Sequence, residues 1–189
     1  SDLDRRGYKK EAEERLELLI HYQSTVGVPG TYSTIEGQYY GAGGYECGGY
    51  NKSHGWVLWG LGEHYWYHRD KEWLNRIAPS VIKACDWITK ERQSTKKFDA
   101  NGKKVIEYGF LPAGSLEDVT DFWHWLATNA PTYWGFKNIA KALIDIGHPE
   151  GERLLKDAEE YLNDLIAGFR ESMIISPVVK LLDGTFVPH

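Results

Sequence analysis

The sequence is poor in residues that mark several classes of protein. Only 2 of its 189 residues are cysteines, and they form neither a disulfide framework nor a zinc-binding pattern. Cys85 falls on the apolar face of a predicted helix, so we expect a small core residue there. Cys47 lies in a glycine-rich loop and is expected to be accessible. Neither cysteine indicates a compartment.

Long apolar runs and basic clusters are also missing. No apolar stretch approaches the roughly 20 residues of a membrane-spanning helix, so we predict no membrane partner. The net charge of −5 comes without a patch of Lys and Arg, so we predict no nucleic-acid partner. The first residues are not a signal peptide, and the missing initiator methionine indicates a processed or excised chain.

Aromatic residues, in contrast, are abundant. They reach 14% of the chain, with 8 Trp and 12 Tyr, and many lie in glycine-rich segments outside periodic helices. The irregular stretch 27–52 is the longest of these segments, and it carries no phosphate-loop pattern. Such rings are candidates for a ligand-binding surface.

Hydrophobic periodicity predicts five helices of two kinds. Amphipathic spacing marks 8–25, 71–93 and 150–172, whereas 53–69 and 123–146 are apolar on nearly every side and are expected to be interior helices. Asn-Gly at 101–102 and Asp-Gly at 183–184 predict hairpins after two of the amphipathic helices. Gly147 is expected to end the second interior helix.

The two kinds of helix alternate, and the pattern repeats. Trp59-Gly60-Leu61 in the first interior helix matches Trp134-Gly135-Phe136 in the second, which indicates stacked helical hairpins. Interior helices surrounded by amphipathic ones predict an all-α fold of the α/α toroid type, with short β-hairpins in its loops. We expect residues 1–189 to form a single α/α-hairpin domain that ends in mid-repeat, as a fragment of a larger six-hairpin toroid.

The richest candidate site is the stretch 108–129, where acids meet aromatics at a helix entrance. Glycines and a proline break regular structure there, and Glu117, Asp118 and Asp121 follow just before Trp123. Carboxylates for proton transfer and flat rings for stacking are what a carbohydrate site needs. The same acids also fit helix caps, since a capping-box-like sequence spans 115–118. Both interpretations stand at this point.

Three segments resemble a known superfamily. The residues 49–56, the segment 84–88, and the loop 109–114 that leads to Asp-Phe-Trp at 121–123 are similar to the six-hairpin glycosidases, which are (α/α)6 toroids that include glucoamylase-like enzymes. The likeness covers most of residues 50–175. It implies that loops at the N-terminal ends of the interior helices line a sugar-binding funnel.

The resemblance also implies roles for individual residues. Glu117 or Asp118 is expected to be the proton donor, and Asp121 and Glu46 are expected to be second carboxylates or hydroxyl-binding groups. The expected stacking residues are Tyr45, Tyr50, Trp56 and Trp123. His54 and His124 fall in the same funnel, where they either bind hydroxyls or serve in packing and capping.

One pair of histidines has the spacing of a metal site. His64 and His68 lie four residues apart on a predicted helix, so both imidazoles face one side. No third ligand lies near them in the sequence. The pattern therefore favours hydrogen-bonded or solvated histidines, and we predict no metal site.

These observations lead to a functional hypothesis and a rival. The first is a glycoside hydrolase-like protein that cleaves glycosidic bonds in a carbohydrate substrate by paired-carboxylate acid/base catalysis, without a cofactor. As a fragment, this chain need not contain both carboxylates. The rival is a non-catalytic helical domain that binds glycans or assembles with a partner. A partial toroid also exposes apolar surface of its interior helices, which predicts self-association.

Overall fold

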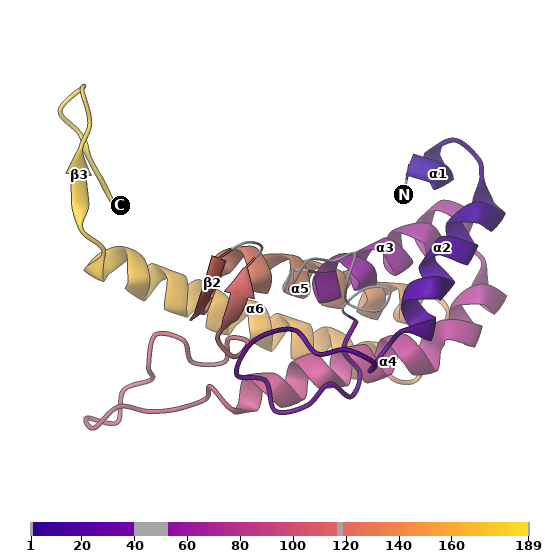
Figure 1. Cartoon of the computed structure of the whole chain (residues 1–189), viewed down its shortest axis with the longest axis horizontal. Coiled ribbons are helices and arrows are strands. Elements are labelled where there is room, and N and C mark those ends of the chain that lie inside the picture. The colour runs from indigo at the N-terminus through magenta and orange to yellow at the C-terminus, as the bar shows by residue number, and fades with distance from the viewer. Residues whose placement is uncertain (1, 40–52, 117–118, 189) are drawn as a thin grey trace.

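The computed structural model describes residues 2–39, 53–116 and 119–188. These residues form a mostly helical fold, as predicted, with two small antiparallel strand pairs (Figure 1). Of the two strand pairs, only the one at 178–188 was predicted. The helices are α1 (Asp2–Arg5), α2 (Lys9–His21), α3 (Ser53–His68), α4 (Lys71–Gln93), α5 (Leu126–Asp145) and α6 (Gly151–Ile175). The strands are β1 (Gly114–Leu116), β2 (Val119–Trp123), β3 (Val178–Lys180) and β4 (Phe186–Pro188).

Helices α3 and α5 pack side by side and run parallel. Where the start of α3 meets the middle of α5, a Cβ added to Gly135 would lie 2.2 Å from the carbonyl oxygen of Gly55, a separation that only glycine allows. At their C-terminal ends, Arg69 just after α3 donates from Nη1 to Asp145 of α5 over 2.9 Å. Residues later in α3 therefore contact residues later in α5, so the two helices are parallel. Their close approach depends on glycine.

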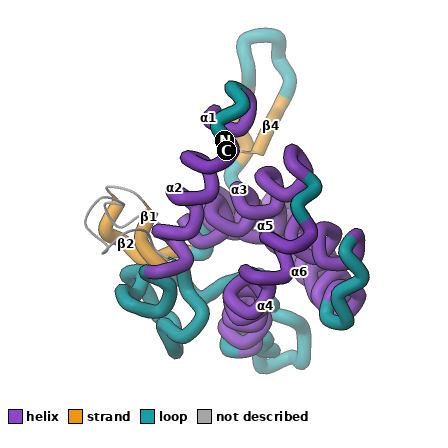
Figure 2. Tube along the Cα trace, turned by 90° about the vertical axis from the view of Figure 1, so that its right-hand side faces the viewer, coloured by secondary structure: helices purple, strands orange, loops and turns teal. Residues whose placement is uncertain are grey.

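The other long helices pack against the buried sides of this pair. Lys9 of α2 reaches Asp70 over 2.5 Å at one end, and Leu16 packs over Gly60 farther along, so α2 runs antiparallel to α3. Helix α4 follows α3, and α6 follows α5, each after a short connection (Figure 1). A view turned by 90° shows α4 below α3 and α5 (Figure 2). Helices α2 and α4 are also neighbours, because Arg76 of α4 donates from Nη2 to Glu17 of α2 over 2.7 Å.

Local signals explain where these helices turn. Asp70 is the N-cap of α4, because its Oδ1 accepts the backbone N–H of Trp73 over 2.9 Å. Gly147 adopts a left-handed φ of +76° just after the C-cap of α5, as predicted. Both helical hairpins are therefore closed by residues whose preferences were readable in the sequence.

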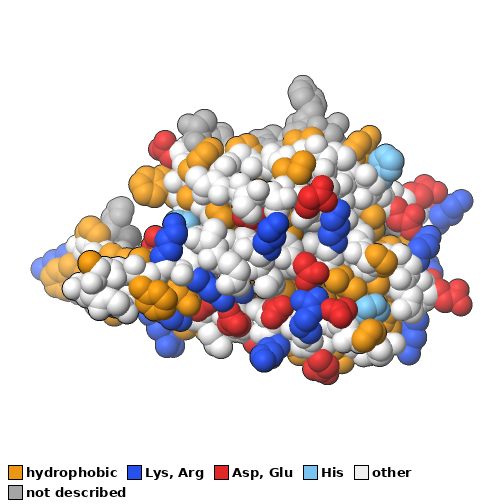
Figure 3. All heavy atoms as spheres, turned by 90° about the horizontal axis from the view of Figure 1, so that it is seen from below, with side chains coloured by type: hydrophobic (Ala, Val, Ile, Leu, Met, Phe, Trp, Pro, Cys, Tyr) orange, Lys and Arg blue, Asp and Glu red, His pale blue; other side chains and the backbone are white. Residues whose placement is uncertain are grey.

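One hydrophobic core holds the helices together. Buried residues of α2, α3, α4, α5 and α6 form a single cluster, which Tyr39, Phe110 and Leu111 join from the loops. The outer surface carries acidic and basic side chains of both signs, intermixed over the face that Figure 3 shows. This is the arrangement expected of amphipathic outer helices.

Several details differ from the sequence predictions. Helix α5 begins at Leu126 rather than Trp123, because 119–123 pair with β1 as strand β2. Asp121 therefore lies in a strand and is not a helix cap, and the N-cap position belongs to Trp125, which makes no side-chain cap. The turn at 101–102 closes one isolated bridge, Phe98 with Lys104, whereas 178–188 form the predicted hairpin.

Helices α3 and α5 are also less enclosed than predicted. They share a core-facing side, but Trp56 of α3 is 50% exposed and Trp134 of α5 is 62% exposed. The expectation of burial on every side was wrong, because the described residues place no neighbour over this side of the pair.

Candidate functional site

The exposed side of α3 and α5 carries three tryptophans around a shallow hollow. Trp56, Trp59 and Trp134 line it with Ala130 and Pro131, and it encloses about 370 Å³. We call this surface the tryptophan face. Its rings share one side because helical residues three or four apart point the same way.

The glycine contact between the helices explains how the rings from two helices reach one hollow. Because Gly135 lets the backbones approach closely, Trp134 beside it lies across from Trp59, the residue before Gly60. Trp56 and Trp59 meet edge to face, with ring centroids 5.6 Å apart. The hollow is thus apolar and is formed by rigid rings on rigid helices.

A polar hollow of about 300 Å³ adjoins the tryptophan face and shares Trp59 and Trp134 with it. Its polar groups come from one helical turn farther along, where Asn138 donates from Nδ2 to Glu63 Oε1 over 3.1 Å. Trp66 fixes the other end of that amide by donating to Asn138 Oδ1 over 2.7 Å. Tyr133, Lys137 and Lys141 complete the lining.

This combination suits a particular kind of ligand. Tryptophan rings can stack on apolar C–H surfaces. The carboxylate of Glu63 can accept hydrogen bonds from hydroxyl groups, and the ammonium groups of Lys137 and Lys141 can donate them. A sugar ring presents both kinds of surface. A ligand with an apolar ring face and hydroxyl groups would match the lining of the two hollows.

The β1–β2 hairpin carries three of the predicted site residues. Trp123 is 61% exposed at the end of β2, and Asp121 is exposed on the same strand. His124 is half-buried and its Nδ1 is hydrogen-bonded to the carbonyl of Leu111 over 2.8 Å. Trp123 and Asp121 are thus accessible to a ligand, whereas one ring nitrogen of His124 holds the loop.

His54 has the surroundings of a packing residue. It is buried, its Nδ1 accepts the backbone N–H of Tyr39 over 3.0 Å, and its Nε2 is 3.2 Å from the carbonyl oxygen of Ala84. Burial lowers the pKa of His54 to about 3, so the ring is neutral at physiological pH. Of the two interpretations of His54 in the sequence, this geometry favours packing over hydroxyl binding.

Five predicted site residues lie outside the described residues. They are Tyr45, Glu46, Tyr50, Glu117 and Asp118. Of the predicted residues that are described, Trp56 lies on the tryptophan face, while Asp121 and Trp123 lie on the β1–β2 hairpin. The predicted pairing of carboxylates stays a prediction.

Sequence reasoning missed part of the tryptophan face and its polar neighbour. From the sequence, Trp59 and Trp134 indicated a repeat but were not predicted to bind a ligand. The shared Trp-Gly pattern already marked equivalent positions on two helices. Glu63, Lys137 and Asn138 carried no motif, because they come together only when α3 and α5 pack.

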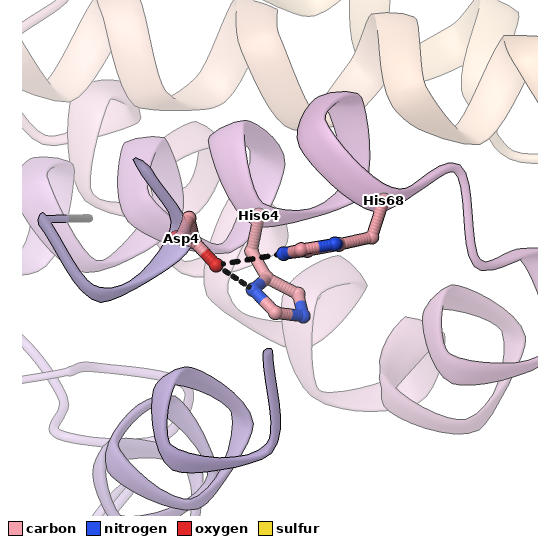
Figure 4. Close-up of side chains that lie close together, drawn as sticks. All are labelled: Asp4, His64 and His68. Atoms are coloured by element: carbon pink, nitrogen blue, oxygen red, sulfur yellow. Dashed lines mark hydrogen bonds and ion pairs between the residues drawn. The ribbon is translucent and has the colours of Figure 1, made fainter. Parts of the chain in front are cut away.

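A second cluster lies on the side of α3 that faces the N-terminal helices. Oδ1 of Asp4 lies 2.7 Å from Nδ1 of His64 and 3.0 Å from Nε2 of His68 (Figure 4). Asp4 comes from α1, about sixty residues earlier in the chain. Of the described residues, these three are the group whose ligand atoms are close enough to hold a metal ion.

Comparisons with family models, curated proteins and solved structures found no match for this chain. Among the residues that the structure describes, no helix is both long and apolar enough to cross a lipid bilayer.

Proposed function

We propose that this protein is carbohydrate-active and that the tryptophan face binds a sugar chain, as part of a glycoside hydrolase of the α/α toroid type. The observation that carries the proposal is the hollow between Trp56, Trp59 and Trp134, with the polar groups of Glu63 and Asn138 beside it. A monomeric helical bundle has no structural need for three accessible tryptophans in one place.

The helix arrangement supports the toroid part of the proposal. Helices α3 and α5 are parallel neighbours, and each is followed by a helix on the outside of the pair. Repeating this unit around an axis makes a ring of inner helices within a ring of outer ones. The N-terminal ends of α3 and α5 lie at the same end of that ring, beside the tryptophan face.

Hydrolysis needs a proton donor and a second carboxylate. Glu117 and Asp118 remain the proposed proton donors, and Asp121 and Glu46 the proposed partners, in line with the resemblance to six-hairpin glycosidases. Glu63 adds a carboxylate that the structure places beside the tryptophans, held by Asn138 in the manner of a hydroxyl-binding group. This chemistry proceeds without a cofactor.

One observation favours the rival function, a glycan-binding domain without catalysis. Glu63 is the single carboxylate lining the two described hollows, and it is already hydrogen-bonded to Asn138. A lone carboxylate with rings around it binds sugars but does not complete an acid/base pair. Binding and hydrolysis therefore have to be measured separately.

Calorimetric titration with a panel of neutral and acidic oligosaccharides tests binding. We expect one class of oligosaccharide to bind, and Trp134→Ala to weaken that binding by about tenfold, which corresponds to loss of one stacking contact of roughly 1.4 kcal/mol. Phe98→Ala is the matched control, because Phe98 is a similarly exposed aromatic away from the tryptophan face. Equal affinity of the two variants, or no binding by any sugar, would reject the proposal.

Hydrolysis of aryl glycosides and oligosaccharides by the same proteins tests catalysis. We expect Glu117→Gln or Asp118→Asn to abolish turnover while leaving sugar affinity within about twofold, because only the proton donor is lost. Binding without turnover in the unaltered protein would instead establish the rival function.

A further inference from the structure

Asp4, His64 and His68 form a cluster made entirely of residue types that bind metal ions. Hydrogen bonding alone would not require these types. His64 and His68 lie one helical turn apart on α3, and their rings are 4.7 Å apart. Asp4 places one oxygen, Oδ1, within 3.0 Å of a ring nitrogen from each of them. Both imidazoles thus converge on one point beside a carboxylate, as Figure 4 shows.

We propose that Asp4, His64 and His68 bind a divalent transition-metal ion of the zinc type. Two imidazoles and one carboxylate form a ligand set that zinc and its transition-metal neighbours prefer, whereas magnesium and calcium prefer oxygen ligands. The three ligand atoms lie within 4.8 Å of one another. This site is separate from the tryptophan face and does not depend on carbohydrate binding.

The distances fit a site that opens slightly when it is filled. Zinc bonds to nitrogen and oxygen are about 2.0–2.1 Å, so tetrahedral ligand atoms lie about 3.3 Å apart. The two observed separations, 2.7 and 3.0 Å, are those of hydrogen bonds. A shift of the Asp4 carboxylate by a fraction of an ångström would bring Oδ1 to this spacing from both ring nitrogens.

A second observation points to a ligand at His64. Its other ring nitrogen, Nε2, lies 3.4 Å from Oε1 of Glu13 on α2. Metal-binding histidines commonly donate their remaining N–H to a carboxylate, which fixes the tautomer and turns the metal-binding nitrogen toward the ion. Glu13 is placed for that role, and Lys9 lies 3.4 Å from the same oxygen to balance its charge.

The cluster is mostly buried but is accessible on one side. Asp4 and the side chain of His64 are buried, while the side chain of His68 is 18% exposed. An ion therefore enters past His68, and it keeps one position for water or another ligand. Because Asp4 belongs to α1 and the histidines to α3, a bound ion ties the N-terminal helix to the body of the fold.

The test is calorimetric titration of the chelator-treated, untagged full chain with zinc chloride. We expect one zinc ion per chain, with affinity lowered at least 100-fold in His68→Ala and in Asp4→Asn. His21→Ala is the matched control, because His21 is an exposed histidine of α2 outside the cluster, and it should bind zinc like the unaltered protein. Magnesium chloride should give no binding.

Limited trypsin digestion gives a readout that needs no activity. Cleavage after Arg5 and Arg6, which flank the end of α1, should slow at least tenfold when zinc saturates the unaltered protein, but not when zinc is added to His68→Ala. His68 is the least buried of the three, so its removal disturbs folding least, and circular dichroism verifies the fold of each variant. Stoichiometric binding that survives both substitutions, or no binding at all, would overturn the proposal.

Discussion

His54 and His64 are both buried histidines of α3, yet their surroundings differ in kind. The ring nitrogens of His54 contact backbone groups of Tyr39 and Ala84, whereas those of His64 face the carboxylates of Asp4 and Glu13. Backbone partners stabilise a neutral ring of fixed tautomer, and a carboxylate partner on one ring nitrogen is typical of a metal-binding histidine. Two histidines ten residues apart therefore serve packing in one case and a candidate metal site in the other.

The buried His54 predicts a pH dependence of stability. Its pKa is about 3 in the folded protein and near 6.5 when unfolded, so below pH 6.5 the unfolded state binds a proton that the native state excludes. The free energy of unfolding should therefore fall as pH decreases from about 6.5 toward 3, by up to about 1.4 kcal/mol per pH unit from this group. Urea denaturation at several pH values measures the slope.

The control for this prediction is His54→Asn. Asparagine accepts the Tyr39 N–H in place of Nδ1 but does not titrate, so this variant should be less stable at pH 7 and less sensitive to acid. Parallel pH profiles in the two proteins would contradict the assignment.

Arg92 predicts a large loss of stability for a single substitution. It is 1% exposed, donates from Nε to the carbonyl of Gly109 over 2.6 Å and from Nη2 to Asp164 over 2.8 Å, and lies over the ring of Tyr161. Arg92→Ala should cost about 3–5 kcal/mol, because it leaves a carboxylate without its buried partner. Thermal and urea denaturation measure the cost.

Arg153 is the matched control, because it also links α6 to α4. Its Nη2 lies 2.9 Å from Asp86, but both side chains are largely exposed. Arg153→Ala should change stability by no more than about 1 kcal/mol. A similar loss in the free energy of unfolding for both substitutions would show that burial does not determine how much these ion pairs stabilise the protein.

At the scale of elements, the closeness of α3 and α5 rests on glycine. A Cβ at Gly135 would lie 2.2 Å from one backbone oxygen and 2.9 Å from Leu58 Cβ. Rotation of a side chain moves neither of these atoms, so it cannot relieve the clash. Gly135→Ala should therefore destabilise the protein by about 2–3 kcal/mol. It should also disturb sugar binding, because Trp134 is the adjacent residue.

Gly60→Ala on the same pair of helices is the contrasting variant. Its new Cβ would meet Leu16 at 3.6 Å, an ordinary contact, and alanine is the better helix former by about 1 kcal/mol. This variant should be neutral or slightly stabilised in urea denaturation. Equal destabilisation by both substitutions would mean that helix propensity, rather than the interhelical contact, sets the effect.

At the scale of the whole molecule, exposed apolar surface predicts self-association. Trp56, Trp134 and Leu126 are each at least half exposed on α3 and α5. Sedimentation velocity at increasing concentration should detect a monomer–dimer equilibrium, and Trp134→Lys should shift it toward monomer because a charge resists burial. Phe98→Lys is the control and should leave the equilibrium unchanged.

This prediction is linked to the proposed function. If sugar and the second copy use the same tryptophans, a saturating oligosaccharide should dissociate the dimer by mass action. A dimer that persists at saturation would assign the two contacts to different surfaces.

Much of the helical framework was predictable because its signals are local. The 3.6-residue period located α4 and α6 to within a few residues, Asp70 marked a cap, and Gly147 marked a helix end. Strand β2 was not predictable in this way. Its residues read as the entrance of a helix, and pairing with β1 overrides that local preference.

The sequence by itself determined the five longer helices and their order, because helical periodicity and helix ends depend on residues within a turn or two of one another. It also showed the Trp-Gly pattern at 59–60 and again at 134–135. Only the tertiary structure decided which side of α3 stays open, and that Glu63 meets Asn138 beside the tryptophans. It also decided that Asp4 completes a cluster with His64 and His68. No local pattern encodes a contact across sixty or more residues, because such a contact forms only when packing of the apolar faces brings distant helices together.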